Sequence, residues 1–172
     1  MGAGEGTFEV ERRYLVRVRD GLWATLGEGS RLQQGYVAAG RSSVRIRLGE
    51  PRGPVLTCKS GAGVRRREVE AVVPEPLADA LLEASGGRRI EKIRHRLGRW
   101  ELDRFGGGLE GLVLMEVELD REDEPIPDPP DGVVIIREVT DDNHFTNQGL
   151  ACMTPTAQRE LVRAVQEETS KW

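Results

Sequence analysis

Charged side chains at every second position are the features of this sequence whose spacing could do chemistry. Near the N-terminus Glu9, Glu11 and Arg13 alternate in this way, and Glu116 and Glu118 do so further along the chain. Alternate side chains of a β-strand lie on one face, about 7 Å apart. Two carboxylates in that arrangement repel each other, and a cation or basic ligand bound between them would relieve the repulsion.

The same pattern recurs in most of the predicted strands, as pairs that are wholly acidic or wholly basic. These are Arg45 and Arg47, Glu68 and Glu70, Lys92 and Arg94, and Glu101 and Asp103, while Lys59 stands alone. The intervening positions are mostly apolar, so each strand has a charged face and an apolar face. A face chosen for solubility would set opposite charges across from each other. The doublets therefore favour a charged cavity, and a fully hydrated sheet face stays open as the alternative.

A cavity with such a lining suits a ligand that carries strong negative charge and is accompanied by cations. Arginine and lysine bind phosphate oxygens. Carboxylates supply the oxygen ligands that Mg²⁺ and Mn²⁺ accept, whereas a site with oxygen ligands alone disfavours zinc and copper. A polyphosphate bound together with a divalent metal meets both requirements, and the residue pattern predicts a site of this kind.

Composition sets further bounds on the function. The 172 residues are expected to form one domain, residues 1–172, and 31% of them are charged. The net charge of −4 creates no overall field that would attract nucleic acid, so we expect no nucleic-acid partner. His95 and His144 are far apart in sequence, which disfavours a histidine metal site or a Ser/His/Asp triad.

The cysteines and the apolar segments bear on location. Cys58 and Cys152 have neither metal-ligand spacing nor a disulfide pattern, which fits a reducing cytosol. The N-terminus lacks a basic segment followed by an apolar one, and no apolar run approaches the ~20 residues that span a bilayer. We therefore expect a cytoplasmic protein without membrane contact.

Hydrophobic alternation and turn residues predict that the chain consists mostly of strands. Strands are expected at residues 7–16, 31–38, 43–48, 55–59, 67–73, 89–97, 99–105, 112–119 and 133–139, and helices at residues 20–28, 76–84 and 154–167. Strands in mostly adjacent order favour an antiparallel sheet that curls or closes, with helices packed outside. An eight-stranded closed barrel would be just wide enough inside for side chains or one small ligand.

Nine segments, in order along the chain, resemble the motifs of CYTH domains, the triphosphate tunnel metalloenzymes. Residues 9–16 resemble the N-terminal Glu-x-Glu-x-Lys signature. The other segments are Gln34-Gly35-Tyr36, Val44-Arg45-Ile46-Arg47, Leu56-Thr57-Cys58-Lys59, Arg67-Glu68-Val69-Glu70, Glu91-Lys92-Ile93-Arg94, Trp100-Glu101-Leu102-Asp103, Gly111-Leu112-Val113 with Met115-Glu116-Val117-Glu118-Leu119, and Glu138-Val139-Thr140-Asp141. The resemblance spans about residues 9–150 and implies a closed eight-stranded antiparallel β-barrel whose lumen binds a triphosphate.

The resemblance also implies roles for individual residues. The phosphate-binding cations would be Arg13, Arg45, Arg47, Lys59, Lys92 and Arg94, and the ligands of Mg²⁺ or Mn²⁺ would be Glu9, Glu11, Glu116 and Glu118, with help from Glu101, Asp103 or Glu138. Tyr36 and Lys92 match the family's catalytic pair. A lysine beside a phenol lowers the phenol's pKa from about 10, which makes a base for the attacking water. Arg13 departs from the family's lysine: it keeps the charge but cannot donate a proton.

These expectations combine into one functional hypothesis. It is a metal-dependent triphosphatase, a monomer or homodimer, that releases the terminal phosphate of a small-molecule substrate, inorganic tripolyphosphate. The alternatives on the same fold are a thiamine triphosphatase and an adenylate cyclase, which should need aromatic stacking at the tunnel mouth. A further alternative is a polyphosphate or nucleotide sensor that binds without turnover.

Overall fold

The structure, a computed structural model, describes residues 7–61 and 65–171, with side chains from Val10 onward except those of residues 65 and 66. Within these ranges the chain forms one antiparallel sheet with the strand order β5-β4-β3-β2-β6-β7-β8-β1-β9. The strands are β1 (Thr7–Val18), β2 (Ser30–Ala38), β3 (Ser42–Leu48), β4 (Val55–Ser60), β5 (Arg65–Val72), β6 (Arg89–Leu97), β7 (Trp100–Phe105), β8 (Val113–Leu119) and β9 (Val133–Glu138). The predicted mainly-β class is confirmed, and each predicted strand lies within two residues of its observed bounds.

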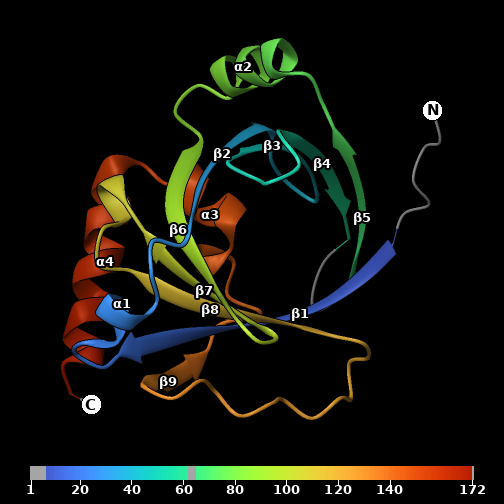
Figure 1. Cartoon of the computed structure of the whole chain (residues 1–172). Coiled ribbons are helices and arrows are strands. Elements are labelled where there is room, and N and C mark those ends of the chain that lie inside the picture. The colour runs from blue at the N-terminus through green and yellow to red at the C-terminus, as the bar shows by residue number, and fades with distance from the viewer. Residues whose placement is uncertain (1–6, 62–64, 172) are drawn as a thin grey trace.

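The sheet curls strongly around a central space (Figure 1). β1 pairs with β8 and β9 on its two sides, and its first residues also pair with β5, Thr7 opposite Glu68 and Val10 opposite Arg65. Successive strands in the order are therefore neighbours in space as well. The alternate charged residues consequently meet on the concave side.

The convex side of β1, β7 and β8 is apolar, as the alternation predicts. Tyr14 packs edge-on against Trp100, with ring centroids 5.7 Å apart, and Met115 and Val117 lie in the same cluster. The proline-rich connection from β8 to β9 covers this cluster, since the Trp100 Nε1 donates to the Asp128 carbonyl at 2.9 Å. Covering the convex face in this way keeps its large side chains from water.

The concave side changes character along the strands. On β1 the inward residues Glu11 and Arg13 are followed by Leu15, and Leu15 lies opposite Leu114 of β8. Both leucines are buried with Phe145 and Leu150 in one hydrophobic cluster. Apolar side chains therefore fill one end of the interior, and the charged residues surround the remainder.

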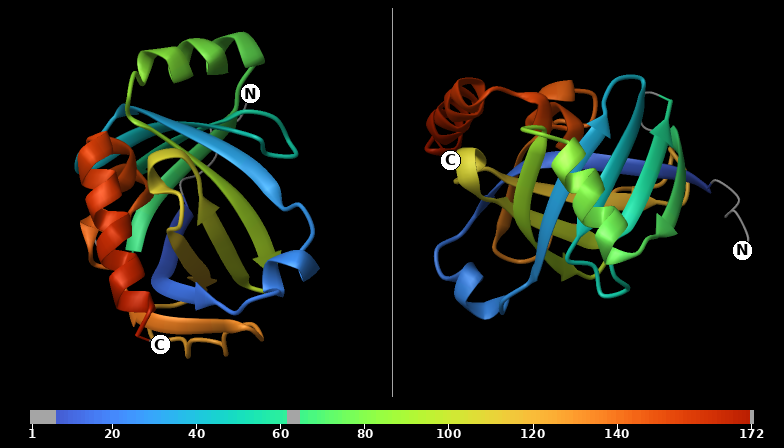
Figure 2. Two further views of the ribbon diagram at one scale, coloured as in Figure 1. Left: turned by 90° about the vertical axis from the view of Figure 1, so that its left-hand side faces the viewer. Right: turned by 90° about the horizontal axis from the view of Figure 1, so that it is seen from above.

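Four helices and two 3₁₀ turns join or cover the described strands. They are α1 (Leu22–Thr25), α2 (Glu75–Ala84), α3 (Asn147–Cys152), α4 (Pro155–Thr169), η1 (Gly107–Leu109) and η2 (Asn143–Phe145). α2 and α4 lie outside the curled sheet (Figure 2), as predicted. α3, which the sequence analysis missed, contacts β2 and β6 at the apolar end of the interior. None of the described helices has the length and apolarity needed to cross a membrane.

The helix predicted at residues 20–28 is largely wrong, because only Leu22–Thr25 is helical. Gly21, Gly27 and Gly29 have φ angles of 88°, 69° and 68°, in the left-handed region that ends a right-handed helix. The apolar residues of this segment still pack, with Leu22 and Trp23 against the convex cluster. The helical spacing of the apolar residues therefore predicts their burial correctly, but it does not predict the length of the helix.

Candidate active site

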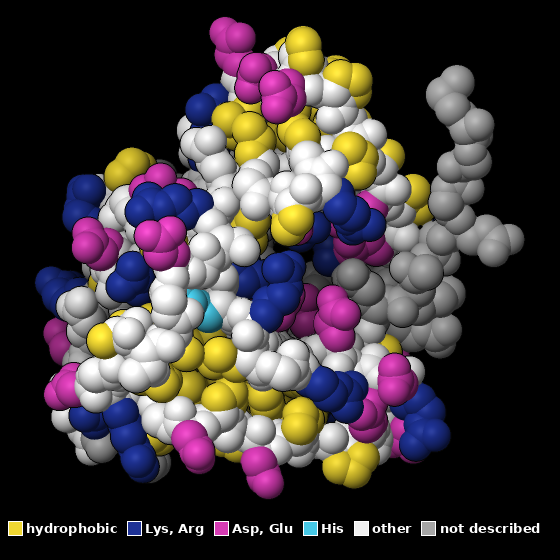
Figure 3. Space-filling view, viewed as in Figure 1, with side chains coloured by type: hydrophobic (Ala, Val, Ile, Leu, Met, Phe, Trp, Pro, Cys, Tyr) yellow, Lys and Arg dark blue, Asp and Glu magenta, His cyan; other side chains and the backbone are white. Residues whose placement is uncertain are grey.

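A cavity of about 720 Å³ occupies the charged part of the interior, a volume typical of small-molecule sites. Side chains from β1 to β8 line it, together with residues of η2 and α3. The structure brings ten of the predicted site residues to its surface: Glu11, Arg13, Tyr36, Arg45, Arg47, Lys59, Arg94, Glu101, Glu116 and Glu118. The surface view shows a hollow in which basic and acidic side chains meet (Figure 3). The charged-cavity interpretation is therefore the one the fold supports, rather than a hydrated outer face.

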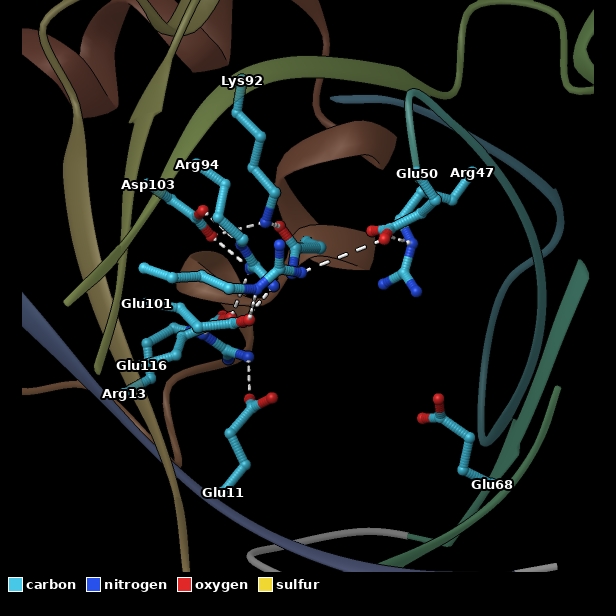
Figure 4. Close-up of polar contacts among 12 residues, drawn as sticks. Glu11, Arg13, Arg47, Glu50, Glu68, Lys92, Arg94, Glu101, Asp103 and Glu116 are labelled. Atoms are coloured by element: carbon cyan, nitrogen blue, oxygen red, sulfur yellow. Dashed lines mark hydrogen bonds and ion pairs between the residues drawn. The ribbon is translucent and has the colours of Figure 1, made fainter. Parts of the chain in front are cut away.

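One wall of the cavity is a network of buried ion pairs on β1, β6, β7 and β8 (Figure 4). Arg94 holds Asp103 through two hydrogen bonds of 2.6 Å, one from Nε and one from an Nη, and also contacts Glu101. Glu116 accepts at 2.8 Å from Arg94 and at 2.6 Å from the Nε of Arg13. Glu116 thus links Arg13 and Arg94 into one hydrogen-bonded network. Each of these three charged groups has more than one partner of opposite charge, which holds the side chains in place.

The surroundings of Glu116 determine its charge. Burial by itself would raise its pKa, but the charges of Arg13, Lys92 and Arg94 more than offset burial and hold the pKa well below its usual range. Glu116 is therefore ionised in the folded protein at neutral pH, and its two carboxylate oxygens accept from Arg13 and Arg94.

This shift predicts how stability depends on pH. Because the pKa of Glu116 is lower in the folded than in the unfolded chain, the carboxylate stabilises the fold fully above the unfolded value of about 4.3. That stabilisation is lost as the pH falls through the depressed folded pKa. Melting temperatures measured from pH 7 to pH 3 should fall steeply below about pH 4 in the wild type. In Glu116→Gln the fall should be shallower, and equal slopes would contradict this assignment.

Lys92 and Asp103 lie within the wall rather than on the cavity surface. Neither side chain is exposed, and the Lys92 Nζ donates to Asp103 Oδ2 at 2.5 Å and to Asn147 Oδ1 at 3.0 Å. Lys92 lies opposite Phe105 in the sheet, one step closer to the apolar end than Arg94. Burial and the charge of Arg94 lower the pKa of Lys92, while Asp103 opposes them. The lysine reaches the cavity through Asn147, which does line it.

The opposite wall carries Arg45, Arg47, Lys59 and Glu70 on β3, β4 and β5. Arg45 donates to the Thr57 hydroxyl at 3.2 Å, and Thr57 donates to Glu70 at 2.8 Å. The Lys59 ammonium forms an ion pair with Glu68. Within the described part of the chain, the buried Nε groups of Arg45 and Arg47 have no hydrogen-bond acceptor. Buried N–H groups are rarely left in this state, so an anionic acceptor in the cavity would complete them.

Tyr36 corrects one expectation from the sequence. Burial raises the pKa of its phenol, and the charges of Arg45 and Lys59 oppose that rise only in part. The phenol is therefore neutral at neutral pH in the ligand-free protein, not the phenolate that a neighbouring lysine would favour. The cations that act on Tyr36 are Arg45 on β3, Lys59 on β4 and Arg13 on β1, and Lys92 instead faces Asp103.

The carboxylates of the cavity are oxygen donors, the ligand type that Mg²⁺ and Mn²⁺ accept. Glu11 lies directly opposite Glu118 across the β1–β8 pair, and Glu101 lies opposite Glu116 across β7–β8. Like charges directly opposite each other are unfavourable unless a cation intervenes. Among the described residues, no three Asp, Glu, His or Cys side chains form a ready-made metal cluster, since arginines occupy the carboxylates. The donors are all oxygens, so the residues fit a hard divalent cation.

Glu138 and Glu9 are two predicted metal ligands that the described cavity lining does not include. Glu138 is exposed on β9, where it accepts from Arg12 at 3.0 Å and from Thr140 at 2.7 Å, and it does not belong to the described cavity lining. Its contact Arg12 alternates with the inward residues Glu11 and Arg13, so this pair is on the convex side. Glu9 is on β1, but its side chain lies outside the described residues.

The cavity also contains residues that the sequence analysis did not identify, notably Gln34, Glu50, Arg96 and Asn147. Gln34 lies two residues before Tyr36 on β2. It is uncharged, so the pattern of alternate charged residues does not mark it as a site residue. Asn147 belongs to the unpredicted helix α3. Glu50 lies in a turn rich in proline and glycine, where alternation gives no signal. Arg96 continues the Lys92 and Arg94 alternation, which could have identified it.

A curled antiparallel sheet around a cavity of paired cations and carboxylates defines the class of protein. An inorganic triphosphatase of Nitrosomonas europaea is 35% identical over 161 residues, which cover 86% of this chain and 99% of the relative. An inorganic triphosphatase of Acetivibrio thermocellus is 32% identical over 148 residues, covering 83% of this chain and 92% of the relative. The chain belongs to the inorganic triphosphatase family.

Structural comparison agrees with the sequence relatives. A crystal structure of an inorganic triphosphatase matches with a TM-score of 0.56 at 32% identity, covering 88% of this chain and 99% of the other. No family model matches the chain.

Proposed function

We propose that this protein hydrolyses inorganic tripolyphosphate and releases its terminal phosphate with the help of Mg²⁺ or Mn²⁺. The observation that carries the proposal is a cavity lined by both cations and carboxylates, in which the buried Nε groups of Arg45 and Arg47 have no acceptor among the residues that the structure describes. Phosphate oxygens would complete the arginines. The family membership supports a hydrolase acting on phosphoanhydride bonds.

The same proposal extends to the architecture. We infer that β1 to β8 form a closed tunnel of the CYTH type, and the pairing of β1 with β5 supports this, because these strands are otherwise separated by the rest of the sheet. A closed wall would surround the substrate on all sides and exclude bulk water from its charges. Electrostatic contacts are stronger in such a setting.

The cations and the carboxylates of the two walls would have different roles in binding the substrate and the metal. Arg45, Arg47 and Lys59 on one side, with Arg13 and Arg94 on the other, would hold the phosphate oxygens and fix the chain in line for attack. Glu11 and Glu118, joined by Glu116, would hold the metal, which neutralises charge on the transferred phosphoryl group. Lys92 would support this arrangement by orienting Asp103 and Asn147.

Tyr36 is the proposed base for the attacking water. The phenol must lose its proton to the solvent or to a phosphate oxygen before it can accept one, because burial keeps it neutral in the ligand-free protein. Arg13 contributes charge alone. We therefore expect the activity to rise with pH through the neutral range.

The composition of the lining favours an inorganic substrate over a nucleotide or thiamine triphosphate. Among the cavity residues that the structure describes, Tyr36 is the one aromatic side chain, and it is buried. Stacking of a base or a thiazole ring would need exposed aromatic surface.

The test is phosphate release from tripolyphosphate, ATP and thiamine triphosphate, each with Mg²⁺, with Mn²⁺ or with EDTA. We expect rapid release from tripolyphosphate with either metal and at least tenfold slower release from the other two, because the stacking contacts are missing. EDTA should abolish release. Thermal stabilisation by tripolyphosphate without any release would instead identify a binding sensor.

A further inference from the structure

Glu50 is a buried carboxylate of the cavity that the proposed mechanism does not use. It follows Gly49, whose φ is 93° and whose position could not carry a side chain, since a Cβ there would lie 1.8 Å from the Arg31 carbonyl oxygen. The turn after β3 is therefore packed directly onto the backbone of β2. This packing fixes Glu50 at the cavity, where only 9% of its side chain is exposed.

Glu50 contacts two cations from β3 and β6, the two strands that flank β2. Its Oε1 lies 3.1 Å from the Arg47 Nε, and its Oε2 lies 3.9 Å from an Nη of Arg96 on β6. The second ion pair crosses the open space between the two walls (Figure 4). An internal carboxylate thus occupies the position beside Arg47 where a phosphate group of the substrate would bind.

The contact with Arg47 is incomplete. Although the atoms are close, the Arg47 Nε does not direct its hydrogen at Glu50, and it has no other acceptor among the described residues. Burial and the neighbouring charge of Arg45 lower the pKa of Arg47, so this guanidinium is in an environment that disfavours its charge. A phosphate group in the cavity would supply more negative charge to this guanidinium than one carboxylate does.

We propose that Glu50 is an internal competitor of the substrate that sets the affinity of the cavity for triphosphate. When the cavity is without ligand it shares Arg47 with Glu70 and Arg96 with Glu101, and a bound phosphate group must take its place beside Arg47. This inference rests on the proposed function, because it requires an anionic substrate. It has a second consequence for the products: Glu50 can return to Arg47 as pyrophosphate leaves.

The test is calorimetric titration of tripolyphosphate into the wild type, Glu50→Gln and Glu83→Gln, in EDTA so that the substrate is not hydrolysed during the titration. Glutamine keeps the shape of the side chain and removes its charge, so Glu50→Gln should bind about threefold to tenfold more tightly. Inhibition of turnover by pyrophosphate should strengthen by a similar factor. Glu83 lies on α2, away from the cavity, and its variant should match the wild type.

A shorter acid provides a second variant. Glu50→Asp keeps the charge but withdraws the carboxylate from Arg47, and its affinity should lie between those of the wild type and Glu50→Gln. Unchanged or weaker binding by both variants, with tight binding by the wild type, would overturn this inference alone. A wild type that neither binds nor hydrolyses tripolyphosphate would overturn the proposed function, and the inference with it.

Discussion

Replacing Arg94 with alanine is expected to lower the free energy of unfolding by about 3–5 kcal/mol, the cost of breaking a buried ion pair by removing one partner. Arg94 contacts Asp103, Glu116 and Glu101, and the first two are almost completely buried. Without the guanidinium, the Asp103 and Glu116 carboxylates would repel each other. Water could not screen this repulsion, because both side chains are buried. Urea unfolding monitored by tryptophan fluorescence would measure the change.

Two further variants make this test specific. Arg17→Ala removes an exposed arginine of β1 and should change stability very little. The double variant Arg94→Met with Asp103→Asn removes charge from both partners and should recover part of the loss, as coupled residues are not additive. A cost below about 1 kcal/mol for Arg94→Ala, the range of exposed ion pairs, would contradict the network described for this wall.

Replacing Arg45 with alanine is expected to act on the reaction rather than on the fold. Arg45 donates to Thr57, also interacts with the Tyr36 phenol, and forms a longer ion pair of 3.6 Å with Glu70, while its Nε has no acceptor in the described chain. Its contacts with carboxylates are therefore longer than those of Arg94, and its removal should cost the fold less. A cation that holds the phosphate in the transition state is worth about 100-fold or more in rate.

We therefore expect kcat/KM for tripolyphosphate to fall by about 100-fold in Arg45→Ala, with a smaller fall in melting temperature than in Arg94→Ala. Arg163→Ala, an exposed position on α4, is the matched control and should keep full activity. Half or more of the wild-type activity in Arg45→Ala would show that this arginine does not touch the substrate. Together the Arg94 and Arg45 variants compare a cation that also holds buried carboxylates of the fold with one whose expected role is mainly in substrate binding.

The strands and the charged cavity could be predicted from the sequence because both depend on a period of two residues. Glu11, Arg13 and Glu116 were assigned to one face, and the fold places all three on the cavity. Lys92 and Arg94 look equivalent in sequence. They differ in the structure because the inner face becomes apolar towards α3, and Lys92 lies opposite Phe105 at that boundary.

Contacts that depend on turns and on register could not be predicted in the same way. Glu50 reaches the cavity from a turn whose path is set by the close approach of Gly49 to β2. The pairing of Glu11 with Glu118 required the register of β1 against β8. α3 is only six residues long and its N-cap is Thr146, whose hydroxyl accepts from the Gly149 amide at 2.9 Å, a signal too local to stand out.

The most direct test of the central claim is phosphate release from tripolyphosphate at rising Mg²⁺ concentration, comparing the wild type with Glu11→Gln. The cavity chemistry predicts release that requires metal, and a Glu11→Gln variant that needs at least about tenfold more Mg²⁺ for the same rate. Both proteins should have similar melting temperatures. Release that persists in EDTA, or an identical Mg²⁺ dependence in the two proteins, would contradict a metal-dependent triphosphatase built on these carboxylates.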